Sequence, residues 1–165
     1  MTVSAKILAV ALVFATTALT MPAMADDPPY LLGGVGSWEV FRNSNHAAEI
    51  DLSYRSDLSV WIIKPQFGLV TATDGDFYGF AGIYTDLALT DHLIFTPNLS
   101  AGGYGGHGIR LGSHVEFRSG ADLFWRFENA SRLGMGFYHL SNGGITRRNP
   151  GDESLVVQYA YPFSL

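Results

Sequence analysis

Three residues near the C-terminus have the types needed for ester hydrolysis by a serine nucleophile. His139 and Ser141 are two positions apart, and Glu153 follows the serine by twelve positions. On an extended strand, residues two apart project from the same face, with Cα atoms roughly 6.5 Å apart. If a hairpin returns Glu153 to His139, the carboxylate can orient the imidazole while the imidazole accepts the serine proton. This arrangement predicts a Ser-His-Glu catalytic triad.

Segments of alternating apolar and polar residues must position these three residues, and they indicate β-strands. Sustained alternation is typical of a strand with one apolar and one polar face. The segment lengths match the roughly 9–11 residues that a tilted strand needs to cross a bilayer. Eight such segments follow residue 25, at about 30–42, 46–55, 60–71, 77–87, 92–102, 114–127, 132–142 and 153–165.

Composition and loop lengths favour a membrane barrel over an ordinary soluble domain. Charged residues make up 15% of the chain, against roughly 25% in typical domains, while aromatics reach 13% and glycines number 19. Brief connections at Ser56-Asp57, Thr90-Asp91 and Glu128-Asn129 alternate with mostly longer, glycine-rich ones at 73–76, 103–112 and 143–152. We therefore predict an all-β, eight-stranded antiparallel transmembrane β-barrel.

A soluble β-sandwich or a lipocalin-like barrel shares the same alternation, but its apolar face would point inward. We favour the membrane barrel because an eight-stranded lumen has little space for many aromatic rings. The ionisable row of His114, Glu116, Arg118 and Asp122 should then face the lumen and pack there as a paired plug.

The first 25 residues have the features of a secretory signal peptide. Lys6 precedes the apolar run Ile7–Ala18, and Ala23-Met24-Ala25 fits a cleavage site. The predicted mature domain is then residues 26–165. Without Lys6 the formal charge changes from −5 to −6, which argues against nucleic acid as a partner. The chain has no cysteine, so disulfides and cysteine metal sites are excluded.

The parity of the last two segments assigns the three candidate catalytic residues to the apolar, lipid-facing surface. Pairing His139 with Glu153 also opposes Phe137 to Leu155, and such pairs have Cβ atoms about 4.5–5.5 Å apart. Phe137, Met135 and Leu155 could line a groove for an acyl chain, or they could be ordinary lipid contacts. Asn142 and the Gly143-Gly144 backbone could stabilise an oxyanion, although these residues could equally just open a loop.

The segment His139-Leu140-Ser141-Asn142-Gly143-Gly144-Ile145, with Asn149-Pro150-Gly151 and Glu153, resembles the PagL-type lipid A 3-O-deacylases of Gram-negative outer membranes. The resemblance covers the last third of the chain well, and over residues 30–100 it is limited to barrel pattern and length. It implies a barrel with an external active site facing the outer leaflet.

The resemblance implies that His139 is the base, Ser141 the nucleophile and Glu153 the residue that orients the base. Asn142 would help form the oxyanion hole, with Gly144 as a backbone donor. The implied reaction removes the 3-O-linked acyl chain of lipid A in lipopolysaccharide, without a metal ion or another cofactor. Arg147 and Arg148, with Arg110 and His107, lie in predicted extracellular loops, where they either contact lipid A phosphates or are simply solvated.

Two other functions fit the sequence. A small non-enzymatic outer-membrane barrel could have a structural or binding role, and a periplasmic barrel could carry lipid. The sequence also leaves a homodimer open as the assembled state.

Overall fold

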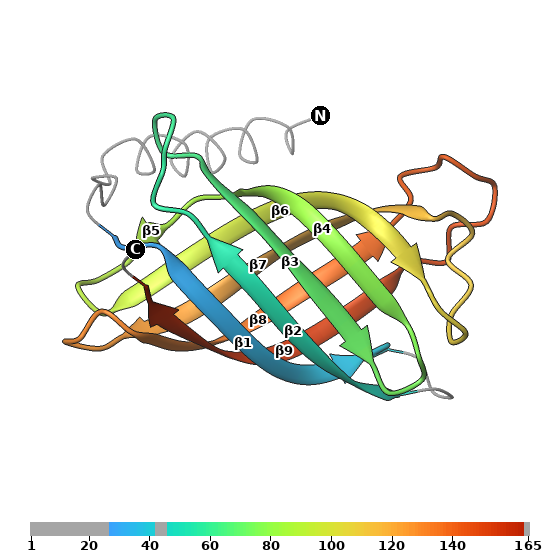
Figure 1. Cartoon of the computed structure of the whole chain (residues 1–165), viewed down its shortest axis with the longest axis horizontal. Coiled ribbons are helices and arrows are strands. Elements are labelled where there is room, and N and C mark those ends of the chain that lie inside the picture. The colour runs from blue at the N-terminus through green and yellow to red at the C-terminus, as the bar shows by residue number, and fades with distance from the viewer. Residues whose placement is uncertain (1–26, 42–45, 164–165) are drawn as a thin grey trace, which may run out of the picture.

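The structure is a computed structural model that describes residues 27–41 and 46–163. Regular structure within these ranges consists of β-strands, which wrap around a single axis (Figure 1). Neither range contains a helix with the length and apolarity needed to cross a membrane. The predicted signal peptide, residues 1–25, lies outside the described residues.

Nine strands of the described chain form one antiparallel sheet that closes on itself. β1 lies between β2 and β9, and a β4–β6 pairing completes the circle. The strands are β1 (Tyr30–Trp38), β2 (Ala47–Arg55), β3 (Lys64–Ala72), β4 (Phe77–Tyr84), β5 (Leu87–Ala88), β6 (Leu93–Gly105), β7 (Val115–Arg126), β8 (Arg132–Ser141) and β9 (Asp152–Pro162).

β4 and β5 are two parts of one barrel strand. Both pair with β6 in a single register, with Tyr84 opposite Asn98 and Leu87 opposite Phe95. Between them, the N–H of Thr85 donates to the carbonyl of Pro97 at 3.2 Å. Proline has no N–H to return such a bond, and this interrupts the ladder. The barrel therefore has eight strands, which confirms the predicted fold class.

The third predicted strand begins later than its sequence pattern indicated. Val60 and Ile63 bridge each other and Trp61 has a φ of 60°, so residues 60–63 form a tight turn. β3 begins at Lys64, and the connection after β2 spans residues 56–63 rather than two residues. Val60 and Trp61 are exposed at the end of the barrel, where apolar and aromatic side chains suit the membrane boundary. Because these turn residues are apolar, the alternation of the strand seemed to begin at residue 60.

Other strand ends differ from the predicted limits by a few residues. β1 ends at Trp38 because Glu39 adopts a φ of 61°, a left-handed conformation that leaves the extended strand. β6 continues to Gly105, so the loop that follows spans residues 106–114. β9 ends at Pro162, and residues 164–165 lie outside the described range.

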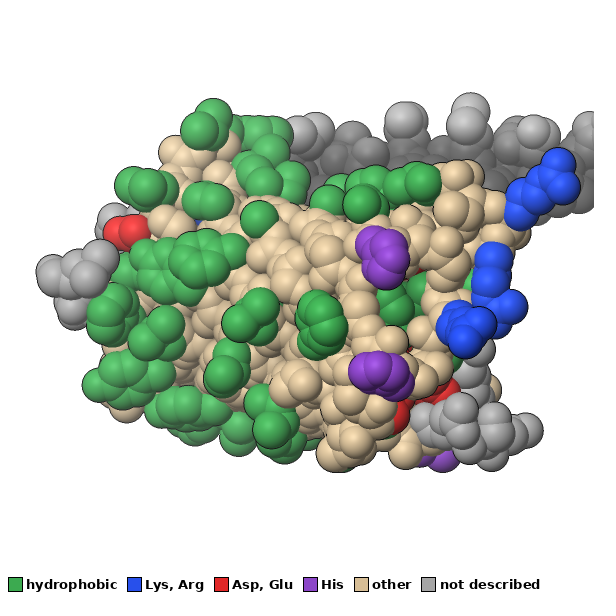
Figure 2. Space-filling view, turned by 45° about the vertical axis from the view of Figure 1, so that its right-hand side comes forward, with side chains coloured by type: hydrophobic (Ala, Val, Ile, Leu, Met, Phe, Trp, Pro, Cys, Tyr) green, Lys and Arg blue, Asp and Glu red, His purple; other side chains and the backbone are tan. Residues whose placement is uncertain are grey.

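The outer face of the barrel is apolar, as the alternation predicted. On β8, Leu133, Met135 and Phe137 are exposed, whereas Tyr138 and Leu140 are buried. Figure 2 shows hydrophobic side chains spread over the side of the barrel that it draws. Exposed apolar side chains around a closed sheet suit contact with hydrocarbon. The soluble alternative, which needs its apolar face inward, does not fit this arrangement.

The lumen is filled by ion pairs and their hydrogen-bond partners. Arg118 pairs with Asp51 and Arg55 pairs with Asp122, each at 2.6 Å. Glu116 is also buried there, as predicted for the ionisable row, but its carboxylate forms no ion pair within the described residues and so is not part of the predicted paired plug. His114 is the exception. It precedes β7 and is exposed, since it lies beyond the strand that turns its neighbours inward.

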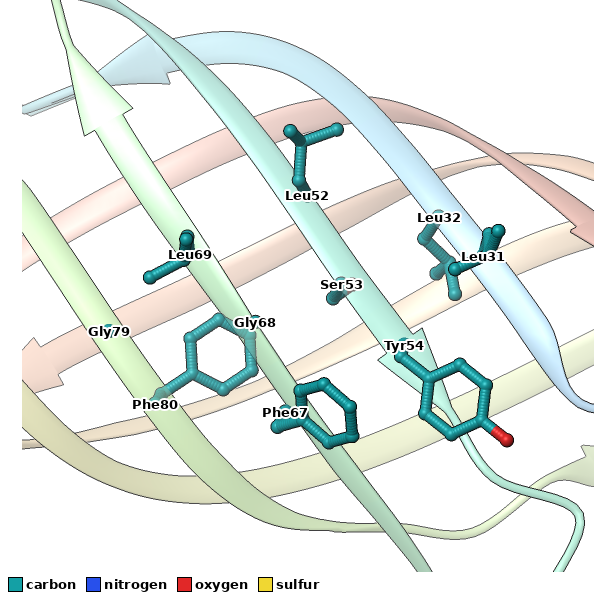
Figure 3. Close-up of a pocket in the computed structure, with 10 residues that line it drawn as sticks. All are labelled: Leu31, Leu32, Leu52, Ser53, Tyr54, Phe67, Gly68, Leu69, Gly79 and Phe80. Atoms are coloured by element: carbon teal, nitrogen blue, oxygen red, sulfur yellow. The ribbon is translucent and has the colours of Figure 1, made fainter.

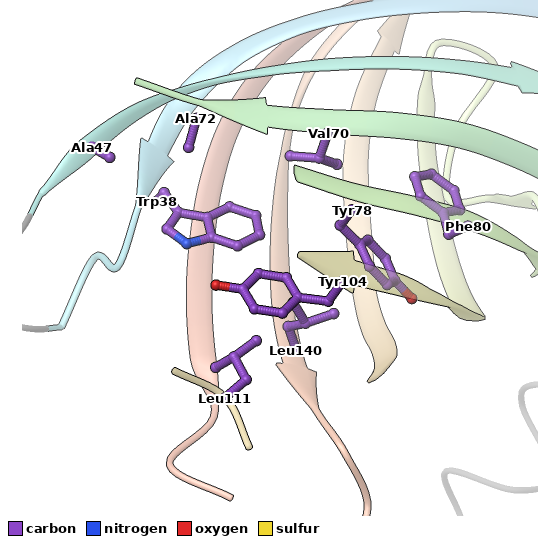
Figure 4. Packing of buried hydrophobic residues seen from close by; sticks show 9 residues of the cluster. All are labelled: Trp38, Ala47, Val70, Ala72, Tyr78, Phe80, Tyr104, Leu111 and Leu140. Carbon is purple, nitrogen blue, oxygen red and sulfur yellow. The ribbon is translucent and has the colours of Figure 1, made fainter. Parts of the chain in front are cut away.

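The lumen also holds more aromatic rings than the sequence analysis allowed. One cluster near the 106–114 loop, shown in Figure 4, contains Trp38, Tyr78, Phe80 and Tyr104. Rings and charges share this space because arginine planes pack on ring faces. The Cζ of Arg118, for example, lies 5.2 Å from the centroid of the Phe80 ring. The premise that the lumen has little space for many rings was wrong, although the fold class it supported is correct.

Candidate active site

The hairpin of β8 and β9 places His139 directly opposite Glu153, as the predicted register required. The Nδ1 of His139 lies 3.0 Å from the Oε1 of Glu153. A carboxylate held at Nδ1 leaves Nε2 as the nitrogen that can accept a proton. The structure therefore brings the predicted base and the predicted carboxylate together.

Ser141 is the last residue of β8 and shares the outward face with His139. Across the β7–β8 pair it lies opposite Phe117, while Ser119 lies opposite His139. Within residues 27–41 and 46–163, the Ser141 hydroxyl makes no hydrogen bond, either to His139 or to another group. The hydroxyl is thus uncommitted and stands two positions from an imidazole on the same face.

Exposure differs between the two members of the His139–Glu153 pair. The imidazole is 44% exposed and the Glu153 side chain 27%. The carboxylate is the more covered group. The backbone of Glu153 is also bound, since the Val40 N–H donates to the Glu153 carbonyl at 2.9 Å. A covered carboxylate and an open imidazole suit a base that must reach an external substrate.

Gly151 lies against the imidazole ring. It has a φ of +68°, which side chains rarely adopt, and a Cβ at this position would lie 2.9 Å from the Cε1 of His139. The same Cβ would lie 3.6 Å from Nε2. A side chain here would therefore crowd the edge of the ring that must face substrate.

Both predicted oxyanion donors already donate hydrogen bonds to groups of the 106–114 and 142–151 loops. Asn142 is 0% exposed, and its Nδ2 lies within hydrogen-bond distance of the Leu111 carbonyl (3.2 Å), the Thr146 hydroxyl (3.1 Å) and the Arg148 carbonyl (2.8 Å). The N–H of Gly144 donates to the Asn142 Oδ1 at 3.0 Å. In this arrangement Asn142 organises the loop that follows the nucleophile.

Asn149 also lies at the site; the sequence analysis included it in the family resemblance but gave it no role. Its Oδ1 accepts the backbone N–H of Asn142 at 3.0 Å, immediately after Ser141. This bond fixes the amide beside the nucleophile and leaves its NH₂ group as a donor. The Asn149-Pro150-Gly151 turn was the available signal, because asparagine in a turn commonly bonds nearby backbone.

Phe41 is a second residue that the sequence did not indicate. It is exposed, and its ring centroid lies 6.0 Å from that of Phe137. Phe137, Met135 and Leu155, the predicted acyl-chain contacts, are all exposed on the same outward face. Phe41 arrives from the β1–β2 connection, far away in sequence, so no local pattern could place it there.

The predicted loop arginines lie at the same end of the barrel as the catalytic candidates. Arg147 and Arg148 are exposed in the 142–151 loop. The Nε of Arg148 donates to the carbonyl of Arg110 at 2.8 Å, which joins this loop to the 106–114 loop. Among the described residues, no group of three or more His, Asp or Glu side chains is arranged to hold a metal ion.

A separate apolar groove lies on the outer face of strands β1–β4, as Figure 3 shows. Its lining has no imidazole and no carboxylate, so it offers no second catalytic group. The lining residues are Leu31, Leu32, Leu52, Ser53, Tyr54, Phe67, Gly68, Leu69, Gly79 and Phe80.

Comparison with known structures agrees with the fold. A solved structure described as the outer membrane enzyme PagL aligns with a TM-score of 0.60 and 19% identity, covering 81% of this chain and 99% of that chain. A designed transmembrane β-barrel aligns with a TM-score of 0.52 and 14% identity, covering 84% and 98%. Identities this low show the shared fold alone. No curated protein sequence matches the chain.

The sequence of the chain gives a more specific result than its fold. The family model for the lipid A 3-O-deacylase PagL matches residues 47–162, which is well over half of the chain. The matched range includes β2 to β9 and so contains the whole hairpin with His139, Ser141 and Glu153. The chain therefore belongs to the PagL family of lipid A 3-O-deacylases, and it is an outer-membrane β-barrel protein.

Proposed function

We propose that this protein is a serine esterase that removes the 3-O-linked acyl chain of lipid A. Ser141 acts as the nucleophile, His139 as the base and Glu153 as the residue that orients the base. The observation that carries the proposal is the His139 Nδ1 to Glu153 Oε1 contact of 3.0 Å on the outward face, beside an uncommitted Ser141. Family membership supports lipid A as the substrate.

We infer that the site faces the outer leaflet. The two longest connections, residues 106–114 and 142–151, lie at the barrel end that carries the site, opposite the C-terminal end of β9 (Figure 1). Outer-membrane barrels have their longer loops outside the cell. With this orientation the triad lies near the head-group boundary, where substrate reaches it by lateral diffusion.

In the first half of the proposed reaction, the Ser141 Oγ attacks the ester carbonyl carbon while the Nε2 of His139 takes its proton. Glu153 stabilises the imidazolium that forms. The tetrahedral intermediate then collapses, the bond between the carbonyl carbon and the sugar oxygen breaks, and His139 returns the proton to that oxygen. The products are an acyl-serine and lipid A with a free 3-hydroxyl.

In the second half, a water molecule attacks the acyl-serine with His139 again acting as the base. The ester bond to Ser141 breaks, and the serine oxygen regains its proton from the imidazolium. The released product is a free fatty acid. Nucleophile and base are both side chains of the protein, so the scheme requires no cofactor.

The oxyanion of both intermediates needs hydrogen-bond donors close to Ser141. The Gly144 N–H and the Asn142 amide can serve only by exchanging their present partners in the loop. The NH₂ group of Asn149 needs no such exchange, because its Oδ1 alone is bound to the Asn142 backbone. We therefore add Asn149 to the proposed donors.

Two isosteric substitutions separate these roles. Asn149→Asp keeps the Oδ1 acceptor for the Asn142 N–H but removes the NH₂ donor, so activity should fall by about a hundredfold with stability retained. Asn142→Asp keeps the acceptor for Gly144 but removes the donor to three loop oxygens, so it should also loosen the loop. Proteolysis of the loop, measured beside activity, distinguishes the two outcomes.

The acyl chain would lie along the exposed side chains of Phe137, Met135 and Leu155, with Phe41 as one wall. These side chains share the outward face with the triad and continue away from it along β8 and β9. An acyl chain there replaces bilayer lipid and keeps its apolar surroundings, which favours approach of the ester to Ser141.

Mass spectrometry of lipid A from cells that express the protein tests the proposed function. Wild type should cause the loss of one hydroxyacyl chain, and Ser141→Ala should not. An unchanged lipid A profile with correctly folded wild type in the outer membrane would reject the esterase and favour a non-enzymatic barrel.

A further inference from the structure

Three arginines in two neighbouring loops differ from the other arginines of the described chain. Arg55, Arg118, Arg126 and Arg132 each pair with an aspartate. Arg110, Arg147 and Arg148 are exposed and form no ion pair with any residue that the structure describes. Figure 2 shows basic side chains gathered at one rim of the barrel, beyond the apolar wall.

The backbone that carries these arginines is held as one unit. The Arg148 Nε donates to the Arg110 carbonyl at 2.8 Å, and the buried Asn142 donates to the Arg148 carbonyl at 2.8 Å. Gly112 has a φ of +99°, and a Cβ there would lie 2.1 Å from the Arg148 carbonyl oxygen. The 106–114 and 142–151 loops are therefore in close contact.

The unit is also anchored to the barrel. Asp76 accepts the N–H groups of Gly108 and Ile109 at 2.8 and 3.0 Å, and its Oδ2 accepts the Tyr104 hydroxyl at 2.6 Å. Leu111, next to Arg110, is buried in the cluster of Figure 4. The side chains of Arg110 and Arg147 thus extend from fixed backbone and are free to turn toward a ligand. Arg148 is held through its Nε and keeps its two terminal nitrogens as donors.

Charge and position together indicate the ligand. The 106–114 and 142–151 loops contain no aspartate or glutamate, and the nearby Asp76 is occupied by backbone N–H groups of the first loop. Asn142, which holds Arg148 in place, directly follows Ser141 in the chain. Several guanidinium groups close together suit a phosphate, because each can donate two parallel hydrogen bonds to its oxygens.

We propose that Arg110, Arg147 and Arg148 form a binding site for a phosphate group on the glucosamine head group of the lipid substrate. The site holds the head group above the hydrocarbon and sets the position of the ester relative to Ser141. This inference rests on the proposed function, because it assigns the substrate end that the triad does not touch.

The test compares lipid A that carries its phosphates with chemically dephosphorylated lipid A, in detergent micelles with the full-length purified protein. Wild type should favour the phosphorylated substrate by roughly tenfold in kcat/KM, mainly through KM. The Arg110→Gln/Arg147→Gln double variant should bring this preference close to one. Neither side chain makes a hydrogen bond in the described structure, so the fold should be kept.

Two matched variants sharpen the result. The Arg110→Lys/Arg147→Lys variant keeps the charge but loses the guanidinium fork, and should recover part of the preference. Arg126→Gln removes one positive charge from the pair with Asp27, away from this site, and should leave the preference as in wild type. An unchanged preference in the double glutamine variant would overturn the proposal.

A binding measurement separates this inference from the proposed catalysis. Ser141→Ala protein should bind phosphorylated lipid A more tightly than dephosphorylated lipid A, and the double glutamine substitution in the same background should abolish the difference. If wild type hydrolyses nothing but this difference is found, the phosphate site stands and the esterase fails. Equal displacement by excess phosphatidylglycerol would show a general anionic surface effect and reject the specific site.

Discussion

The inner and outer faces of β8 and β9 differ in how extensively their polar side chains are hydrogen-bonded. Inside, Tyr138 and Gln158 both donate to Asp122, and Gln158 also donates to the Tyr138 hydroxyl at 2.6 Å. Outside, His139 and Glu153 bind each other while the Ser141 hydroxyl binds nothing in the described chain. The inner face thus carries a connected network, whereas the outer face carries one isolated pair and one unbonded hydroxyl.

This difference shows how one hairpin can serve stability and chemistry at once. Completed hydrogen bonds such as those to Asp122 stabilise the lumen, because a buried polar group left unpaired costs about 1–3 kcal/mol. Polar groups on the outer face at the end of the strands are less buried and avoid this cost. The Ser141 hydroxyl can therefore remain without a hydrogen bond and available to attack a substrate. Four predictions test whether the two faces are independent in this way.

The largest effect should come from Ser141→Ala. Without the nucleophile, the deacylation rate should fall by about 10⁴-fold, which corresponds to roughly 5.5 kcal/mol of transition-state stabilisation. Stability should not change, because the hydroxyl makes no bond in the described structure. Rates on purified lipid A and urea unfolding in micelles measure the two quantities. A large loss of stability would show that the outer face also supports the fold.

Asp122→Ala should have the reverse effect: it should lower stability and leave activity per folded molecule nearly unchanged. Asp122 accepts from Arg55 and Asn98 at 2.6 and 3.1 Å, besides Tyr138 and Gln158. Its removal leaves the Arg55 charge unpaired, so the free energy of unfolding should fall by about 3–5 kcal/mol. Activity per folded molecule should stay close to wild type. Urea unfolding checks the first outcome, and activity normalised to folded barrel checks the second.

Glu153→Ala should weaken catalysis without abolishing it. The nucleophile and the imidazole remain, but Nδ1 loses its carboxylate, and we expect the rate to fall by about a hundredfold, or roughly 2.7 kcal/mol. Glu153→Gln is the matched control, since it keeps the shape but not the charge. A rate as low as that of Ser141→Ala would indicate that Glu153 does more than orient the base.

Gly151→Ala should give the smallest effect. The new methyl would lie 2.9 Å from the His139 Cε1, and the φ of +68° disfavours alanine, at a stability cost of about 1 kcal/mol. A displaced imidazole should lower activity by about tenfold. Comparing kcat/KM with urea stability shows which loss is larger. Unchanged activity would mean that Gly151 serves the turn alone.

Much of the site was accessible to prediction because strand geometry is regular. Alternation with a period of two assigned His139, Ser141 and Glu153 to one face, and one assumed pair fixed the register of the whole hairpin. The limits of β1 and β3 were harder to predict, because the positive φ angles of Glu39 and Trp61 interrupt patterns that look continuous in sequence.

The amino-acid sequence by itself determined the eight-stranded barrel, its apolar outer face and the opposition of His139 to Glu153. Only the tertiary structure decided the bonds of Asn142, the position of Phe41 beside Phe137 and the joining of the two arginine loops. The physical reason is the separation in sequence between the residues that interact. Strand pattern and register repeat along the chain, whereas loop contacts depend on how separate segments meet once the sheet has closed.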